Sequence, residues 1–164
     1  MASSVIAVYP GTFDPITLGH EDIVRRSAQL FGTVIVAVAV AHHKKTLFTL
    51  DERLAMAREA LADCPNVKVA SFDGLVRDFV LQQGAKVMVR GVRSMTDFDY
   101  ELQMSQMNLQ LKGIETLFMS TAPAHSFLSS SLVKEIGAYD GDISAYVPVQ
   151  LVERIKARLK EVQG

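Results

Sequence analysis

The stretch VIAVYPGTFDPITLGH, residues 5–20, decides the fold. Its first five residues form a continuous apolar run, which is typical of a parallel strand buried on both faces. Pro10, Gly11 and Pro15 then prevent a simple continuation of the strand, so the chain must turn. A helical pattern begins near Gly19, with four side chains on one face: Ile23, Val24, Ala28 and Phe31. These residues are therefore predicted to form a strand, a turn and a helix.

The same alternation of short apolar runs and helical patterns continues along the chain. Further strands are predicted at residues 34–40, 67–71, 87–89 and 116–119. Alternation of this kind predicts right-handed βαβ units and a parallel sheet. No repeat or linker divides the chain. We therefore expect an α/β fold, a single domain over residues 1–164 with a Rossmann-like open parallel five-stranded sheet and helices on both faces.

Local signals place several helix ends. Thr49 and Glu52 have the spacing of a capping box, and Gly84 is a candidate C-cap. A long helix is predicted around residues 98–111, and the serines at 129–131 precede another. Pro148 is predicted to open the last helix, with four side chains facing inward: Leu151, Val152, Ile155 and Leu159.

Composition excludes several classes of protein. Lys and Arg total 17 against 18 Asp and Glu, and this balance argues against a nucleic-acid partner. The single cysteine, Cys64, fits a reducing, cytoplasmic setting. The longest apolar run, residues 34–41, is far shorter than the roughly 18 residues that span a bilayer. Residues 1–4 lack the basic start of a signal peptide, so we expect no membrane association.

Candidate phosphate-binding residues follow the first predicted strand. Ligands of such sheets bind beyond the carboxyl ends of the strands. Gly11 allows close approach of the backbone, and Thr12 adds a hydroxyl group. The run TLGH, residues 17–20, is the candidate phosphate-handling centre, because Gly19 and His20 open a helix whose N–H groups and dipole favour an anion. The alternative is a turn with a capping residue and no ligand.

Basic residues follow two further strands. The run HHKK, residues 42–45, is either a solvated loop or a place where one lysine contacts phosphate; adjacent histidines do not indicate a metal site. Arg90 and Arg93 directly end a predicted strand, and guanidinium groups match phosphate oxygens. The alternative for them is ion pairing with Asp97, Asp99 or Glu101.

A serine-rich segment, residues 126–131, follows the fifth predicted strand and offers hydroxyl and N–H groups at a second helix start. The chain has neither a Walker-type phosphate loop nor a Gly-x-Gly-x-x-Gly motif. P-loop kinases and NAD enzymes therefore lose their main support.

Together, YPGTFDP at 9–15, Gly19-His20, Lys44, RGVR at 90–93 and SFLSSS at 126–131 resemble bacterial phosphopantetheine adenylyltransferases. These enzymes belong to the nucleotidyltransferase superfamily with a Thr/His-x-Gly-His motif. The resemblance implies transfer of an adenylyl group from ATP to 4′-phosphopantetheine, giving dephospho-coenzyme A and pyrophosphate. It also implies Mg²⁺ with ATP, a homohexamer, and coenzyme A as a candidate feedback inhibitor.

The resemblance further implies residue roles. His20 would stabilise the transition state, with Lys44 and Arg93 as further catalytic groups. The acceptor phosphate would contact Thr12, Lys44 and Arg90, and Val76 would line the pantetheine channel. The ATP-binding set would be Thr12, Phe13, His20, Gly91, Val92, Arg93, Glu101, His125, Ser126, Phe127, Leu128, Ser129, Ser130 and Ser131. His125 stands where the family usually has Trp or Tyr.

The expected mechanism is in-line attack without a covalent intermediate. A phosphate monoester is already anionic, so no general base is required, and positive potential from His20, Lys44, Arg90 and Arg93 would offset repulsion between two anions. Two alternatives remain. One is a nucleotidyltransferase with another acceptor, such as nicotinamide mononucleotide, or a cytidylyltransferase; the other is a non-catalytic adenine-nucleotide sensor.

Overall fold

The computed structural model of the protein describes residues 4–163, so the expectation about residues 1–4 falls, apart from Ser4, outside the described residues. A five-stranded sheet has the order β3–β2–β1–β4–β5, and every pairing is parallel. The predicted strands are confirmed, with these bounds: β1 Ile6–Gly11, β2 Thr33–Ala39, β3 Val67–Phe72, β4 Val87–Val92 and β5 Glu115–Ser120.

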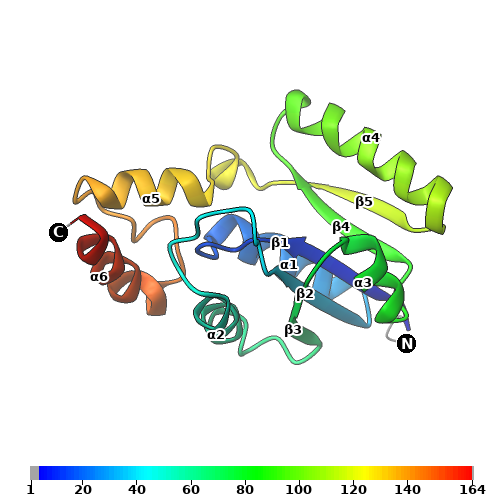
Figure 1. The fold of residues 1–164 in the computed structure, drawn as a ribbon, viewed down its shortest axis with the longest axis horizontal. Coiled ribbons are helices and arrows are strands. Elements are labelled where there is room, and N and C mark those ends of the chain that lie inside the picture. The colour runs from blue at the N-terminus through cyan, green and yellow to red at the C-terminus, as the bar shows by residue number, and fades with distance from the viewer. Residues whose placement is uncertain (1–3, 164) are drawn as a thin grey trace.

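Helices connect the strands and cover both faces of the sheet (Figure 1). Their bounds are α1 Leu18–Leu30, α2 Leu50–Ala60, α3 Val76–Gln82, α4 Met95–Lys112, α5 Ser130–Ala138 and α6 Val152–Gln163. Two short 3₁₀ turns, η1 Pro123–His125 and η2 Val149–Leu151, precede α5 and α6. The α/β fold class is confirmed.

Residues of β1, β2, β3 and β4 enter two separate cores on the two faces of the sheet, as the period of a strand requires. Ala7 and Tyr9 of β1 pack with α1, α2, α5 and α6 in the larger core. Val8, between them, packs with Phe79 and Val80 of α3 in the smaller core on the other face. Burial on both faces explains why the strands read as continuous apolar runs.

The direction of the chain across the sheet reverses after β3. From β1 the chain steps outward to β2 and β3, then returns to the other side of β1 for β4 and β5. The reversal leaves the carboxyl ends of β1 and β4 side by side, flanked by the starts of α1 and α4 (Figure 1). Ligands of open α/β sheets bind at such a point.

The predicted end of the first strand at Tyr9 is wrong by two residues. Pro10 and Gly11 continue β1 and pair with Ala37 and Val38 of β2. Pairing of β1 with β4 covers only Ala7 and Val8, and the Pro10 carbonyl accepts a hydrogen bond from Arg90 of β4 instead. Since Pro10 lies beyond this ladder, its missing N–H removes no bond between β1 and β4.

The predicted helix signals are confirmed at most sites. Thr49 and Glu52 form the capping box, with Thr49 N donating to Glu52 Oε2 at 2.8 Å and Glu52 N to Thr49 Oγ1 at 3.3 Å. Gly84 follows α3 with φ of 66°. Pro148 opens the short turn η2 rather than α6 itself, and the four inward side chains are buried as predicted. Within residues 4–163, no helix is both long and apolar enough to cross a membrane.

Candidate active site

A cavity of about 490 Å³ opens at the carboxyl ends of β1 and β4. Its walls also include the first turns of α1, α4 and α5. Nine of the predicted site residues line it: His20, Arg90, Gly91, Arg93, Glu101, His125, Leu128, Ser129 and Ser130. The chain therefore brings together, at one place, segments that lie far apart in the sequence.

His20 is the third residue of α1 and belongs to its N-terminal cap. The backbone N–H of Thr17 donates to His20 Nδ1 at 3.0 Å, and the His20 N–H donates to Thr17 Oγ1 at 3.4 Å. Because Nδ1 accepts this bond, the neutral ring carries its proton on Nε2. The cap thus fixes both the orientation of the imidazole and its tautomer.

The structure corrects the positive charge that was predicted for His20. Burial, followed by the positive charge of Arg93, lowers the pKa of His20 to about 4. At neutral pH the ring is therefore uncharged, and it offers a phosphate an N–H group rather than a full positive charge. The prediction that His20 contributes positive potential is wrong for the protein without ligand.

Arg90 and Arg93 form ion pairs with two of the predicted carboxylates, and both also line the cavity, so contact with a phosphate stays a prediction. Arg90 donates from Nε and Nη2 to Glu101 at 2.8 and 2.5 Å. Burial disfavours the charged form of Arg90, but the hydrogen bonds and charge of Glu101 raise its pKa overall. Arg93 donates to the Leu128 carbonyl at 2.9 Å and pairs with Asp97 at 3.3 Å.

The serine-rich segment forms the start of α5. Ser129 is the N-cap, its Oγ accepting from Leu132 N at 3.1 Å, and Ser130 donates to the Pro15 carbonyl at 2.8 Å. The Ser130 hydroxyl group thus holds α5 against the turn after β1. The first N–H groups of a helix lack partners within it, so the start of α5 can present them to an anion.

The other eight predicted residues do not line the larger cavity: Thr12, Phe13, Lys44, Val76, Val92, Ser126, Phe127 and Ser131. Phe13 is 2% exposed, and a Cβ built at Gly11 would lie 3.0 Å from its ring. Gly11 itself lines the larger cavity, so its close approach to a ligand stays a prediction. Lys44 is exposed in the loop between β2 and α2, outside the cavity wall.

A second cavity, of about 150 Å³, adjoins the first, and Val76 lines it together with Met88, Met104 and Asn108. Arg90, Tyr100 and Glu101 line both cavities. The buried Oγ1 of Thr116, also in this wall, has no hydrogen-bond partner among the described residues. A buried polar atom of this kind is suited to a polar group of a ligand.

Thr17, the first residue of the predicted run TLGH, lines the cavity as well. Seven other lining residues were missed from the sequence: Tyr9, Pro10, Ile23, Thr96, Asp97, Tyr100 and Thr121. Tyr9 carried no signal, since an aromatic at the end of a buried strand is usually core. It is 6% exposed, and burial raises the pKa of its hydroxyl group well above the usual range.

Comparison with known proteins adds the family. The cytidylyltransferase-like family model matches residues 8–136. A phosphopantetheine adenylyltransferase of Acidovorax sp. (strain JS42) is 60% identical over 156 residues, covering 94% of each chain. One of Thermobifida fusca (strain YX) is 54% identical over 155 residues, again covering 94% of each.

Solved structures agree on the fold. A putative nicotinate-nucleotide adenylyltransferase from Vibrio parahaemolyticus superposes with a TM-score of 0.70 at 15% identity, covering 97% of this chain and 95% of the other. At that identity the likeness establishes the Rossmann-like fold alone, whereas the sequence relatives decide the family. The chain belongs to the phosphopantetheine adenylyltransferase family.

Proposed function

We propose that this chain transfers the adenylyl group of ATP to 4′-phosphopantetheine, giving dephospho-coenzyme A and pyrophosphate. The observation that carries the proposal is the position of Arg90, whose side chain lines both cavities. The larger cavity, with two helix starts and two arginines, suits ATP. The smaller one suits the pantetheine arm, and Arg90 between them suits the acceptor phosphate.

The smaller cavity has the mixed chemistry of a pantetheine arm, which alternates methylene groups with amides. Val76, Met88 and Met104 supply apolar contact, while Asn108 and Thr116 supply polar atoms. The unpartnered Oγ1 of Thr116 can exchange a hydrogen bond with an amide of that arm. The prediction that Val76 lines the pantetheine channel is part of this proposal.

In the proposed reaction a phosphate oxygen attacks the α-phosphorus of ATP in line with the leaving pyrophosphate. The nucleophile is already anionic, so the residues serve to position two anions and to stabilise charge. Arg90 and the exposed Lys44 would hold the acceptor phosphate, and Arg93 would hold the triphosphate. Thr12 would contact both ATP and the acceptor phosphate. His20 Nε2–H would donate to an oxygen that gains charge in the transition state.

Mg²⁺ is proposed to enter with ATP and to supply charge neutralisation at the triphosphate. Asp97 and Glu101, two carboxylates that line the cavity, are paired with Arg93 and Arg90. Phosphate oxygens and water would therefore be its main ligands, a coordination that Mg²⁺ favours.

A cytoplasmic homohexamer is also proposed. Its support is the set of apolar side chains that α4 and β5 expose in the single chain: Met107, Leu109, Leu111 and Leu117. Light scattering would test the assembly, and a monomeric mass would contradict it.

Coenzyme A, which differs from the product by one phosphate, is proposed to compete with the substrates for both cavities.

The decisive experiment mixes the protein with ATP, Mg²⁺ and 4′-phosphopantetheine and measures pyrophosphate release. Nicotinate mononucleotide serves as the control acceptor. Pyrophosphate release that occurs only when phosphopantetheine is the acceptor supports the proposal. Release with nicotinate mononucleotide, or without any acceptor, would overturn it.

Lys44→Ala and Arg90→Ala should raise KM for phosphopantetheine by about 10- to 100-fold, as expected when a hydrogen bond to a charged group is lost. A selective loss of ATP affinity would contradict the two assignments.

A further inference from the structure

The loop that carries Lys44 is exposed at its tip and fixed at its end. Residues 42–45 are exposed, and the Lys44 N–H donates to the Ala41 carbonyl at 3.0 Å. Four residues beyond Lys44 the loop has entered the protein, where Phe48 is 1% exposed. The position of Lys44 therefore depends on how firmly Leu47 and Phe48 are held.

Two side chains close to the loop hold this end from the N-terminal half of the chain. Asp14 accepts hydrogen bonds from Leu47 N at 2.8 Å and from Phe48 N at 2.9 Å. Arg53 donates from Nε to the Phe48 carbonyl at 3.2 Å. The ring of Phe48 packs in the larger core, and the Leu47 carbonyl is bound by neither of these two side chains.

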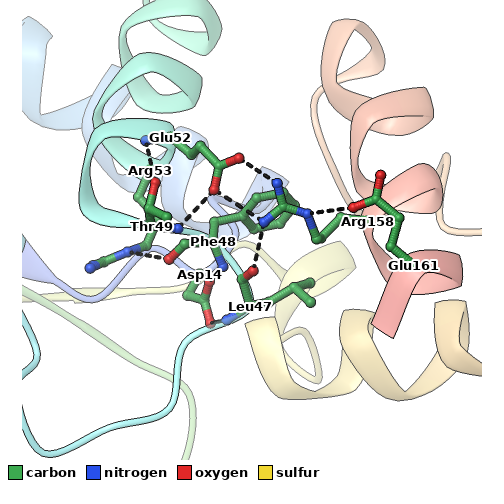
Figure 2. A network of polar contacts seen from close by, with 8 residues as sticks. All are labelled: Asp14, Leu47, Phe48, Thr49, Glu52, Arg53, Arg158 and Glu161. Carbon is green, nitrogen blue, oxygen red and sulfur yellow. Dashed lines mark hydrogen bonds and ion pairs between the residues drawn. The ribbon is translucent and has the colours of Figure 1, made fainter. Parts of the chain in front are cut away.

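The Leu47 carbonyl is bound by Arg158 on α6, more than a hundred residues away in the sequence. Arg158 Nη1 donates to the Leu47 carbonyl at 3.1 Å, and its guanidinium carbon lies 5.1 Å from the centre of the Phe48 ring. The same guanidinium binds both carboxylate oxygens of Glu52. Figure 2 shows Arg158 reaching from the C-terminal helix to Glu52 and the loop end, with Asp14 on the other side of Leu47.

We propose that Arg158 is a positioning residue for the acceptor phosphate, because it fixes the end of the loop that carries Lys44. The inference rests on the proposed function, in which Lys44 contacts that phosphate. Arg158 does not touch either cavity and acts only through the loop. Glu52 orients the guanidinium, and its own position is set by the capping box with Thr49. The last helix of the chain is thereby connected to the site.

The structure offers a matched control on the same two helices. Arg154 of α6 pairs with Glu59 of α2 at 3.0 Å, so it also joins these helices with an arginine–glutamate pair. Glu59 lies seven residues further along α2 than Glu52, at the far end from the loop. Loss of Arg154 should therefore weaken the contact between the helices without releasing Leu47.

The experiment compares Arg158→Gln with Arg154→Gln in the full-length enzyme. Trypsin cleaves after lysine and arginine where several residues on both sides of the bond can extend. Although Lys44 and Lys45 are exposed, cleavage after them also requires release of Leu47 and Phe48, so its rate reports how often the end of the loop opens. We expect Arg158→Gln to raise both this rate and KM for phosphopantetheine by about 10-fold over Arg154→Gln, with KM for ATP unchanged. Arg158→Lys keeps the charge but lacks the planar guanidinium that binds Leu47 and Glu52 at once. Its cleavage rate and its KM for phosphopantetheine should therefore lie between those of Arg154→Gln and Arg158→Gln.

Each outcome decides a separate point. Equal cleavage and equal KM in the two glutamine variants would overturn the inference. Faster cleavage with an unchanged KM would break the link to the acceptor, provided that Lys44→Ala does raise KM. A Lys44→Ala enzyme with an unchanged KM would instead overturn the role proposed for Lys44, and faster cleavage in Arg158→Gln would still support anchoring of the loop.

Discussion

Arg90 and Glu101 form a two-point ion pair at the boundary of the two cavities, with nitrogen–oxygen distances of 2.8 and 2.5 Å. Glu101 belongs to α4, and Arg90 to β4. The third nitrogen of the guanidinium donates to the Pro10 carbonyl at 3.2 Å. Because three contacts fix its plane, Arg90 is oriented before any substrate arrives, which lowers the cost of binding.

Glu101→Gln should therefore weaken the use of phosphopantetheine although Glu101 need not touch it. The amide keeps the size of the side chain but loses the charge, and Arg90 is then free to turn away. We expect KM for phosphopantetheine to rise by about 10-fold in steady-state assays. Asp97→Asn is the control, because Asp97 pairs with Arg93 on the more exposed side of the cavity. An equal effect of both variants would contradict the special position of Arg90.

His20→Gln should separate capping from catalysis. Glutamine at the third position of a helix can accept the N-cap N–H, as in a capping box, but lacks the imidazole Nε2–H. We expect kcat to fall by about 100-fold or more in both His20→Gln and His20→Ala. Only His20→Ala should also lose about 1 kcal/mol of unfolding free energy in urea titrations. Near-wild-type turnover in either variant would remove His20 from the mechanism.

The low pKa of His20 predicts a loss of stability in acid. In the unfolded chain this group has its ordinary pKa of 6.5, and in the folded protein burial lowers it to about 4. Below pH 6.5 the unfolded chain binds a proton that the folded protein does not, so stability falls until the pH reaches about 4. The loss from this group is at most about 3 kcal/mol. Urea unfolding at several pH values would measure it, and His20→Gln should lack this part of the pH dependence.

The order of strands and helices could be predicted because each carries a local signal. A continuous apolar run predicts a strand buried on both faces, and the Thr49–Glu52 box marks its helix start to the residue. His20, Arg90 and Arg93 could be placed together because carboxyl ends of parallel strands share one edge. The order of the strands in the sheet had no such signal, since it depends on contacts between distant segments.

The residues that hold the site in place were harder to find. Arg158 and Glu52 lie more than a hundred residues apart, and no spacing in the sequence connects them. Arg53, in contrast, carries a signal in the sequence, namely its place in the helical pattern. It lies three residues after Leu50 and four before Ala57, so an arginine stands on the buried face of α2.

Arg53 leads to the last prediction, because its side chain joins three segments around the site. It is 1% exposed and donates to the carbonyls of Thr12, Ala39, Val40 and Phe48, at 2.9, 2.7, 3.3 and 3.2 Å. Arg53→Met fills similar space but leaves these buried carbonyls without the guanidinium. We expect a loss of about 3 kcal/mol or more in the free energy of unfolding, measured by urea titration. Arg58→Met on the exposed face of the same helix should change it by less than about 0.5 kcal/mol. If the two variants were equally stable, the four hydrogen bonds would not be what holds the turn after β1 against the loop that carries Lys44.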